Sequence, residues 1–248
     1  MKIVLLGHDD LPSLYALQRL VAAIPQHDFT VLLSGDLRAG ADSPRDLRHL
    51  ADVDARLCAE LRAQGLAKPL LEAADLPQPN SAAGHKVLQR LAPELIVSIR
   101  YRRILKGEAI AIPRLGVLNL HSGVLPEYKG VMATFWAMLY AEVEIGATLH
   151  RIVDGGIDTG PVIGIRRIAA DYDATYLANV LRLYGPGCDM VVEAIEALEA
   201  GRSLQENAQW QGGRYFSTPR GEDVDRFRKH GLELVNGGEM AELEPRKT

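Results

Sequence analysis

The sequence predicts an α/β fold with a mostly parallel sheet and helices on both faces. Residues 3–6 and 29–33 are short, continuous apolar runs of the kind found in buried parallel strands. Between them lies a segment whose leucines recur at helical spacing, so the chain opens with a β-α-β unit, and such crossovers join parallel strands. Hydrophobic residues make up 47% of the 248-residue chain, which is enough for a large core.

The same periodicities predict the elements that follow. The long helical pattern over 174–200 contains Gly185-Pro186, where we expect a break. After Gly201 the chain becomes polar, which predicts a main domain over residues 1–202 and a short C-terminal extension over 203–248. Before residue 174 we expect, in order, a helix over 44–64, a strand over 68–71, a helix that begins after Asn80 or Ser81, strands over 94–99 and 116–120, a helix over 132–140, and strands over 147–153 and 162–168; the extension holds a short strand within 209–216 and a helix over 221–230.

Charge and cysteine spacing exclude several classes of function. The net charge of −4 argues against a dedicated nucleic-acid surface. Cys58 and Cys188 lie far apart and match no metal-ligand spacing, so we interpret both as buried free thiols. The chain opens on a strand without a signal-peptide pattern, and no apolar run reaches the roughly 18 residues of a membrane span. We therefore expect a cytoplasmic protein with no metal and no membrane contact.

Two polar residues stand at the end of the strand predicted over 116–120. Asn119 and His121 are two residues apart, so their side chains leave the strand on the same face. The carboxyl end of a strand is where open α/β sheets bind ligands. Pro126 and Gly130 then predict an irregular loop at the edge of this site.

A second polar loop, residues 153–161, is rich in glycine and carries Asp154 and Asp158. If it folds against the first loop, an amide, an imidazole and a carboxylate meet in one cleft. That set suits attack by a neutral amine on an acyl carbon, with the amide and imidazole binding the oxyanion and the carboxylate assisting the loss of the amine proton. From the residues alone, a structural reading stays open: Asn119 and His121 could satisfy loop backbone, and the glycines could form a hairpin.

Four motifs together resemble one family, the N10-formyltetrahydrofolate-dependent formyltransferases: Asn119-Leu-His121, Leu125-Pro126, Tyr128-Lys-Gly130 and Ile157-Asp-Thr-Gly-Pro161. The resemblance implies a Rossmann-like formyltransferase domain over residues 1–202. It implies that Asn119 and His121 stabilise the transferring formyl oxygen and that Asp158 is their acid/base partner, with Asp154 as a competitor because the loop is longer than usual. The family's Ser-Leu-Leu-Pro stretch is Gly123-Val-Leu-Pro126 here, which removes a hydroxyl.

The resemblance also implies a pocket for the donor, N10-formyltetrahydrofolate. Three segments that match the family's folate-binding positions would form this pocket: Arg103, Ile104 and Leu105; Gly123, Val124, Leu125 and Pro126; and Val153, Asp154, Gly155, Gly156 and Ile157.

The acceptor is expected to be a small-molecule amine. The turn after the first strand, residues 7–12, has one glycine only, so it is neither a dinucleotide cradle nor the phosphate loop of glycinamide ribonucleotide formyltransferases. Residues 98–105 resemble the sugar N-formyltransferases, which implies a nucleotide-linked deoxysugar; hydroxyornithine and methionyl-tRNA stay open as alternatives, as does a homodimer. Arg100, Arg102, Lys129 and His8 are candidate substrate contacts, against the alternative that the arginines form a solvated strand end.

His150 lies on a predicted strand, where we interpret it as a core histidine with its hydrogen bonds satisfied. A different class of protein, a catalytically silent module that only binds folate, is disfavoured because Asn119, His121 and Asp158 are all present.

Overall fold

The computed structural model describes residues 1–35, 43–63, 74–76 and 78–239. The strand expected over 68–71 lies outside these residues. The short strand β3 (Ala74–Asp75) follows it in the chain. In chain order the elements are β1 (Lys2–His8), α1 (Leu11–Ala23), β2 (Asp28–Ser34), α2 (Arg45–Ala63), β3 (Ala74–Asp75), α3 (Ala82–Leu91), β4 (Leu95–Ile99), α4 (Glu108–Ala111), β5 (Val117–His121), β6 (Tyr128–Gly130), α5 (Ala133–Leu139), β7 (Glu144–Ile152), β8 (Val162–Ala169), α6 (Tyr176–Glu199), β9 (Arg214–Phe216) and α7 (Gly221–Lys229).

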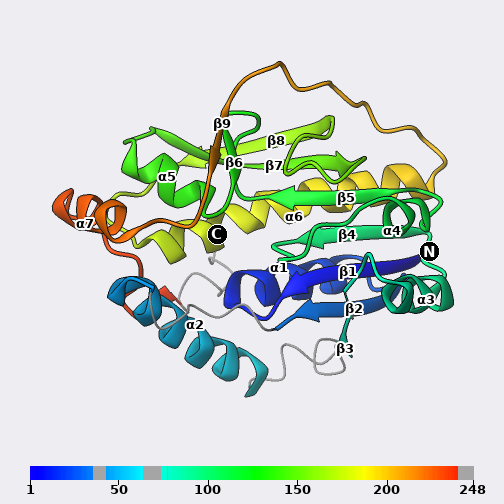
Figure 1. Ribbon diagram of the computed structural model, residues 1–248, viewed down its shortest axis with the longest axis horizontal. Coiled ribbons are helices and arrows are strands. Elements are labelled where there is room, and N and C mark those ends of the chain that lie inside the picture. The colour runs from blue at the N-terminus through cyan, green and yellow to red at the C-terminus, as the bar shows by residue number, and fades with distance from the viewer. Residues whose placement is uncertain (36–42, 64–73, 77, 240–248) are drawn as a thin grey trace.

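One sheet organises the molecule, in the strand order β3-β2-β1-β4-β5-β7-β8 (Figure 1). The first five strands pair in parallel, whereas β7 and β8 are antiparallel to their neighbours. This confirms the predicted α/β fold with a mostly parallel sheet. The short strands β6 and β9 form a separate parallel pair.

Helices pack against both faces of the sheet, as the continuous hydrophobic runs of its strands predicted. Ile3 and Leu5 of β1 belong to the larger core cluster, which also contains the leucines of α1 and the buried face of α6. Val4 and Leu6 point the other way, into a smaller cluster with Leu88 of α3 and Ala109 of α4. In Figure 1, α6 (yellow) passes behind β5.

Side-chain caps begin three of these helices at the residues where the pattern changes. Asp10 accepts a hydrogen bond from the Ser13 amide at the start of α1, Ser81 from the Gly84 amide at α3, and Thr175 from the Ala178 amide at α6. Each cap satisfies an amide that has no partner inside its helix. At α1 the cap places a carboxylate at the carboxyl end of β1.

The break expected at Gly185-Pro186 is wrong, because α6 runs without interruption from Tyr176 to Glu199 with Pro186 inside it. A proline clashes mainly with the preceding residue and with the preceding turn. Gly185 has no Cβ, which removes part of that clash. The buried residues on both sides of Pro186 hold the helix against the sheet, so packing outweighs the local preference.

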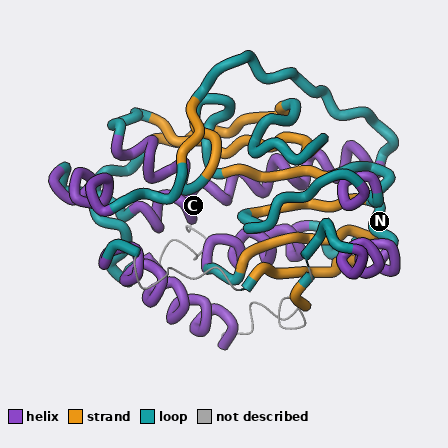
Figure 2. The backbone as a smooth tube through the Cα atoms, viewed as in Figure 1, coloured by secondary structure: helices purple, strands orange, loops and turns teal. Residues whose placement is uncertain are grey.

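The residues after Gly201 return along the molecule as a long loop and then pack onto it (Figures 1 and 2). Asn207 forms a bridge with Val162 of β8, and β9 pairs with β6. The expected strand within 209–216 is thus limited to Arg214–Phe216, and the expected helix is α7. Phe227, Leu232 and Leu234 enter the larger core cluster, whereas Trp210 and Tyr215 are exposed. The division of the chain at residue 202 stays a prediction.

Gly130 is the residue at which the β6–β9 pair requires glycine. Its φ is +96°, and a Cβ there would overlap the carbonyl oxygen of Phe216. Gly201 also has a positive φ, +71°, but has open space around it.

We predict that Gly130→Ala lowers the free energy of unfolding by about 2–4 kcal/mol, because a backbone clash adds to the cost of the positive φ. Gly201→Ala tests the cost of the positive φ alone, and we expect it to lower the free energy of unfolding by about 1 kcal/mol. Urea unfolding of both variants measures the difference. Equal losses would show that the β6–β9 pair accommodates a Cβ without strain.

Candidate active site

Neighbouring antiparallel strands bring the first polar cluster together. Asn119 of β5 lies directly opposite His150 of β7 in the ladder. The Asn119 side-chain nitrogen lies 3.0 Å from His150 Nε2. His150 Nδ1 lies 3.1 Å from the carbonyl oxygen of Arg151, which can only accept, so Nδ1 carries a proton.

Asp158 completes the cluster from the loop between β7 and β8. Its Oδ2 accepts a hydrogen bond of 2.8 Å from the Gly130 amide and lies 3.6 Å from His121 Nδ1, while its Oδ1 lies 3.5 Å from His150 Nε2. The loop folds inward at Gly160, where a Cβ would overlap the carbonyl oxygen of Arg151. The predicted Asn119, His121 and Asp158 therefore meet, and Asp158 is the carboxylate that joins them.

Asp154 has a different environment. Its Oδ1 accepts a hydrogen bond of 2.7 Å from the Gly156 amide, two residues along the same loop. This is the local turn that Asp side chains commonly form. No described histidine contacts it, so the geometry favours Asp158 over Asp154 as the partner of His121.

The electrostatics of the cluster favour a charged Asp158. Burial on its own would raise the pKa of this carboxyl, but His121, a hydrogen bond with His150 and the Gly130 amide together lower its pKa to about 2. Asp158 is therefore ionised at neutral pH and available as a counter-charge.

The two nitrogens of His121 have different surroundings. Nε2 lies 2.7 Å from the carbonyl oxygen of Tyr128, so Nε2 carries a proton. Nδ1 and Asp158 Oδ2 are 3.6 Å apart, beyond a good N–H···O hydrogen bond. When His121 is neutral, the lone pair on Nδ1 faces Asp158 Oδ2. A ligand N–H or O–H group that lies between these two atoms can donate to both.

The predicted donor-binding segments lie beside this cluster. A Cβ at Gly155 would lie 3.0 Å from Lys106 Cγ, so the loop after β4 touches the 153–157 loop. The Asn80 side chain holds the former loop through the Ile104 carbonyl and the Lys106 amide, at 2.7 Å each. Ile104, Val153 and Ile157 are exposed on these two loops, whereas Leu105 is buried.

The third predicted segment, residues 123–126, is pinned from β7. Thr148 donates a hydrogen bond of 2.7 Å to the Gly123 carbonyl and accepts one of 3.1 Å from the Leu125 amide. A Cβ at Gly123 would lie 2.6 Å from His121 Nε2, so glycine lets the chain turn against the imidazole. The Val124 side chain lies against Gly146 of β7, and the Arg103 guanidinium, in the first segment, donates to the Leu76 carbonyl.

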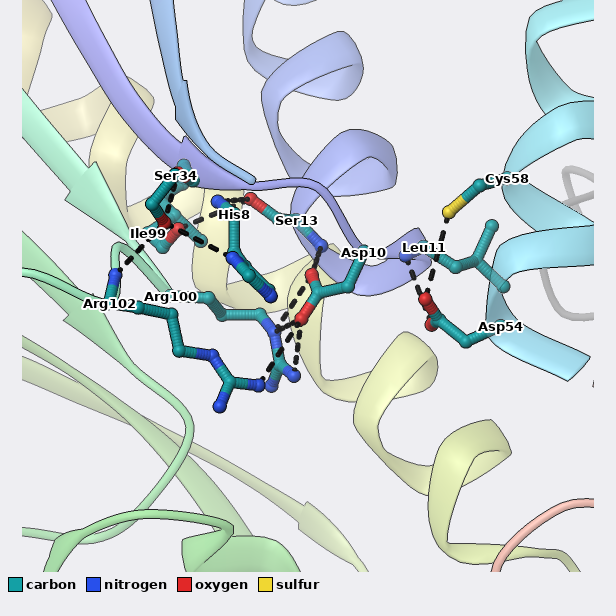
Figure 3. A network of polar contacts seen from close by, with 11 residues as sticks. His8, Asp10, Leu11, Ser13, Ser34, Asp54, Cys58, Ile99, Arg100 and Arg102 are labelled. Carbon is teal, nitrogen blue, oxygen red and sulfur yellow. Dashed lines mark hydrogen bonds and ion pairs between the residues drawn. The ribbon is translucent and has the colours of Figure 1, made fainter. Parts of the chain in front are cut away.

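A cavity of about 540 Å³ opens at the carboxyl ends of β1 and β4. Figure 3 shows how His8, Asp10, Arg100 and Arg102, which line it, lie relative to one another. The predicted contacts His8, Arg100 and Arg102 line it, together with Val131 and Met132, which follow the Gly130 amide bound to Asp158. Lys129 does not line it; its Nζ donates to the Gly212 carbonyl at 3.2 Å. Val131 and Met132 therefore connect one wall of the cavity, along the chain, to the residue that binds Asp158.

For Arg100, the alternative of a solvated strand end is wrong, whereas Arg102 is exposed. Arg100 is largely buried and has φ +58°, and its guanidinium donates to both carboxylate oxygens of Asp10 at 2.7–3.1 Å. The charge of Arg100 holds the pKa of Asp10 below its usual value even though burial opposes this. Arg102 lies 3.9 Å from the same carboxylate and is only partly neutralised by it.

Three residues near the site had no role in the sequence-based hypothesis. His150 is buried as expected, but it contacts Asn119 and Asp158, and only the β5–β7 register could have revealed this. Gln209 donates to the carbonyls of Asp158 and Gly160 from the C-terminal segment. Asp54 of α2 lines the cavity, where burial and the neighbouring Asp10 raise its pKa to about 7.

Within the ranges the structure describes, no group of three His, Cys, Asp or Glu side chains is arranged to hold a metal ion. No helix in the same ranges is both long and apolar enough to cross a membrane. Cys58 and Cys188 are buried and unpaired, which confirms the interpretation of both as free thiols.

We predict that Asp158→Asn removes a pH-dependent part of the stability. The folded-state pKa is depressed, so this contribution is complete above the ordinary pKa of 3.8 and is lost as the pH falls toward 2. The wild-type advantage in unfolding free energy is about 2 kcal/mol at pH 7 and shrinks between about pH 4 and pH 2. Urea unfolding across that range tests this; an advantage independent of pH would contradict it.

Comparison with known proteins bears on the family. Residues 58–194, more than half of the chain, match the family described as formyl transferase. A curated methionyl-tRNA formyltransferase from Thermus thermophilus is 38% identical over 138 residues, which cover 55% of this chain and 43% of the relative. The chain spans less than half the length of such curated relatives.

Solved structures share the fold. A sugar N-formyltransferase from a Shewanella species superposes with a TM-score of 0.61 at 18% identity, covering 88% of this chain and 77% of that one. An N-formyltransferase from Helicobacter canadensis, solved with folinic acid and dTDP-3-aminofucose, has a TM-score of 0.57 at 19% identity, covering 96% and 85%. Together with the family match, the architecture leads to one assignment: the chain belongs to the formyl transferase family.

Proposed function

We propose that this protein transfers the formyl group of N10-formyltetrahydrofolate to a primary amine, and that the amine belongs to a nucleotide-linked deoxysugar. The observation that carries the proposal is the contact of Asp158 with His121, beside the Asn119–His150 pair. Membership of the formyl transferase family supports the reaction.

In the proposed reaction the acceptor nitrogen attacks the formyl carbon, and the C=O electrons move onto the formyl oxygen. The Asn119 side chain retains one N–H beyond the one that faces His150, and that N–H binds the oxyanion. One such donor contributes about 3 kcal/mol to the transition state. His121 assists when its Nδ1 is protonated.

Attack by an amine leaves a proton on nitrogen that must be removed before the product forms. His121 Nδ1 accepts it, with the negative charge of Asp158 Oδ2 beside it, because Nδ1 offers a lone pair when the imidazole is neutral. The tetrahedral centre then collapses, the bond to the donor nitrogen breaks, and His121 returns the proton to the departing nitrogen. Atoms and charges balance without a metal or a redox partner.

The donor site is proposed at the two loops joined by Lys106 and Gly155. Ile104, Val153 and Ile157 expose apolar side chains there, which suits one face of a flat pterin ring. Gly123 allows the backbone to approach His121 closely, so the formyl group can lie near Asn119. The Helicobacter canadensis neighbour was solved with folinic acid, a reduced folate.

The cavity supports a small anionic acceptor. Its volume of about 540 Å³ lies within the range of small-molecule sites, and Arg102 supplies a guanidinium that Asp10 does not fully neutralise. The same Helicobacter canadensis neighbour holds a nucleotide-linked amino sugar. Methionyl-tRNA is the second candidate acceptor, because the Thermus thermophilus relative that carries this name is 38% identical over the matched region.

The test is an assay of formyl transfer from N10-formyltetrahydrofolate to a panel of acceptors: nucleotide-linked amino sugars, hydroxyornithine and methionyl-tRNA. The release of tetrahydrofolate measures the rate. We predict turnover with a nucleotide-linked amino sugar. Asn119→Ala lowers kcat by about 10²–10³-fold through loss of the oxyanion donor. His121→Ala and Asp158→Asn lower it by at least about 10²-fold through loss of proton transfer.

The matched control is Asp189→Asn. Asp189 is an exposed residue of α6 whose carboxylate pairs with Arg19 and not with any residue of the Asn119–His121–Asp158 cluster. The variant retains the wild-type rate. Wild-type rates in Asn119→Ala and Asp158→Asn would contradict the proposed site. Donor binding without transfer to any acceptor would favour the silent folate-binding module instead.

A further inference from the structure

The imidazole of His8, at the end of β1, lies in the wall of the cavity (Figure 3). The residue is only 6% exposed. Its backbone amide donates to Ser13 Oγ at 3.0 Å, and Ser13 Oγ in turn donates to the Ile99 carbonyl at 3.2 Å. The main chain of His8 is therefore fixed to both α1 and β4.

The hydrogen bonds of Ser34 determine which nitrogen of His8 carries the proton. Ser34 Oγ donates its one proton to the Gly7 carbonyl at 3.2 Å and accepts a bond of 3.2 Å from the Arg102 amide. It lies 3.1 Å from His8 Nδ1 and can only accept there, so Nδ1 is protonated. In a neutral His8, Nε2 carries a lone pair, and no described residue hydrogen-bonds to it.

His8 stands in the same row of the sheet as His121. Leu6 of β1 pairs with Ser98 of β4, and Ser98 pairs with Asn119 of β5. His8 lies two residues after Leu6, and His121 lies two residues after Asn119, so the two histidines are level with each other across the sheet. Residues in one row of a parallel sheet point to the same face, so both imidazoles leave the sheet on one side. Two strand spacings place their Cα atoms roughly 10 Å apart. A ligand whose reacting group lies at His121 can therefore reach His8 with a distant part.

Burial holds the pKa of His8 below its ordinary value. Asp10 opposes this by raising the pKa, and Arg102 and Arg100 each lower it by less than Asp10 raises it. The other titratable side chains that line the cavity come from the β1–α1 turn, from α2 and from α6: Asp9, Asp52, Asp54, Cys58, Arg48, Arg62 and Tyr176. Arg62 pairs with Asp9.

We propose that His8 is the specificity-determining residue for the acceptor: its Nε2 accepts a hydrogen bond from a hydroxyl group of the acceptor, beside an anionic group bound by Arg102. The proposal rests on the proposed function and narrows it to hydroxylated anionic amines, such as a sugar linked to a phosphate.

Two substitutions separate the two nitrogens of His8. His8→Asn places an amide N–H near the Nδ1 position, which retains the contact with Ser34, but leaves nothing at Nε2. His8→Gln places its terminal amide near Nε2 and can restore the acceptor. Formyl transfer from N10-formyltetrahydrofolate to a nucleotide-linked amino sugar is measured for both variants, with KM for each substrate.

We expect His8→Asn to raise KM for the amino sugar roughly 5- to 50-fold through loss of one hydrogen bond. KM for the formyl donor and the melting temperature stay at wild-type values. His8→Gln recovers KM to within about threefold. In the wild type, acidification raises KM for the amino sugar as His8 gains a proton at Nε2; His8→Gln lacks this part of the dependence and keeps the part that comes from protonation of the acceptor amine.

An unchanged KM for the amino sugar in His8→Asn would overturn the proposal. So would an equal rise in both KM values, or a lower melting temperature in both variants, since either marks a structural role. If the wild type transfers formyl to no amino sugar, the proposed function fails on its acceptor, and calorimetric binding of the same nucleotide-linked sugar decides the role of His8. Weaker binding by His8→Asn supports it, and equal or absent binding overturns it.

Discussion

The arrangement of the site depends on the buried carboxylate of Asp158. It accepts a hydrogen bond from the Gly130 amide of β6 and lies against His121 of β5 and His150 of β7. One side chain therefore joins β5, β7 and the β6–β9 pair. The β6–β9 pair in turn carries the C-terminal segment, and Gln209 from that segment binds the Asp158 carbonyl. Loss of the charge at Asp158 therefore affects both the chemistry and the attachment of a segment distant in the sequence.

Much of the scaffold could be predicted from the sequence because it rests on short-range signals. Continuous apolar runs predicted the parallel strands, and Asn119 and His121 share a face because they are two residues apart on a strand. The role of His150 depends on the antiparallel register of β5 and β7, which no local pattern encodes. The burial of Arg100 depends on Asp10, 90 residues earlier in the chain, and the continuity of α6 through Pro186 depends on tertiary packing.

The carboxyl edge of the sheet separates two tasks. The end of β5 holds the groups that handle the formyl oxygen and the proton, whereas the ends of β1 and β4 hold a cavity with His8, Arg102 and Asp54. The Arg100–Asp10 pair lines this cavity and holds its geometry through three N–H···O bonds. In this account the acceptor spans both regions, so its reacting nitrogen and its recognition groups contact different strands of one rigid sheet.

In the proposed reaction the formyl group passes directly to an amine and not to water. The most direct measurement uses N10-formyltetrahydrofolate labelled with ¹³C in the formyl group and follows the label by NMR in the presence of a nucleotide-linked amino sugar. The account predicts that the ¹³C signal moves to a formamide on the sugar as tetrahydrofolate is released. Appearance of the label as free formate, with the amino sugar unchanged, would contradict it.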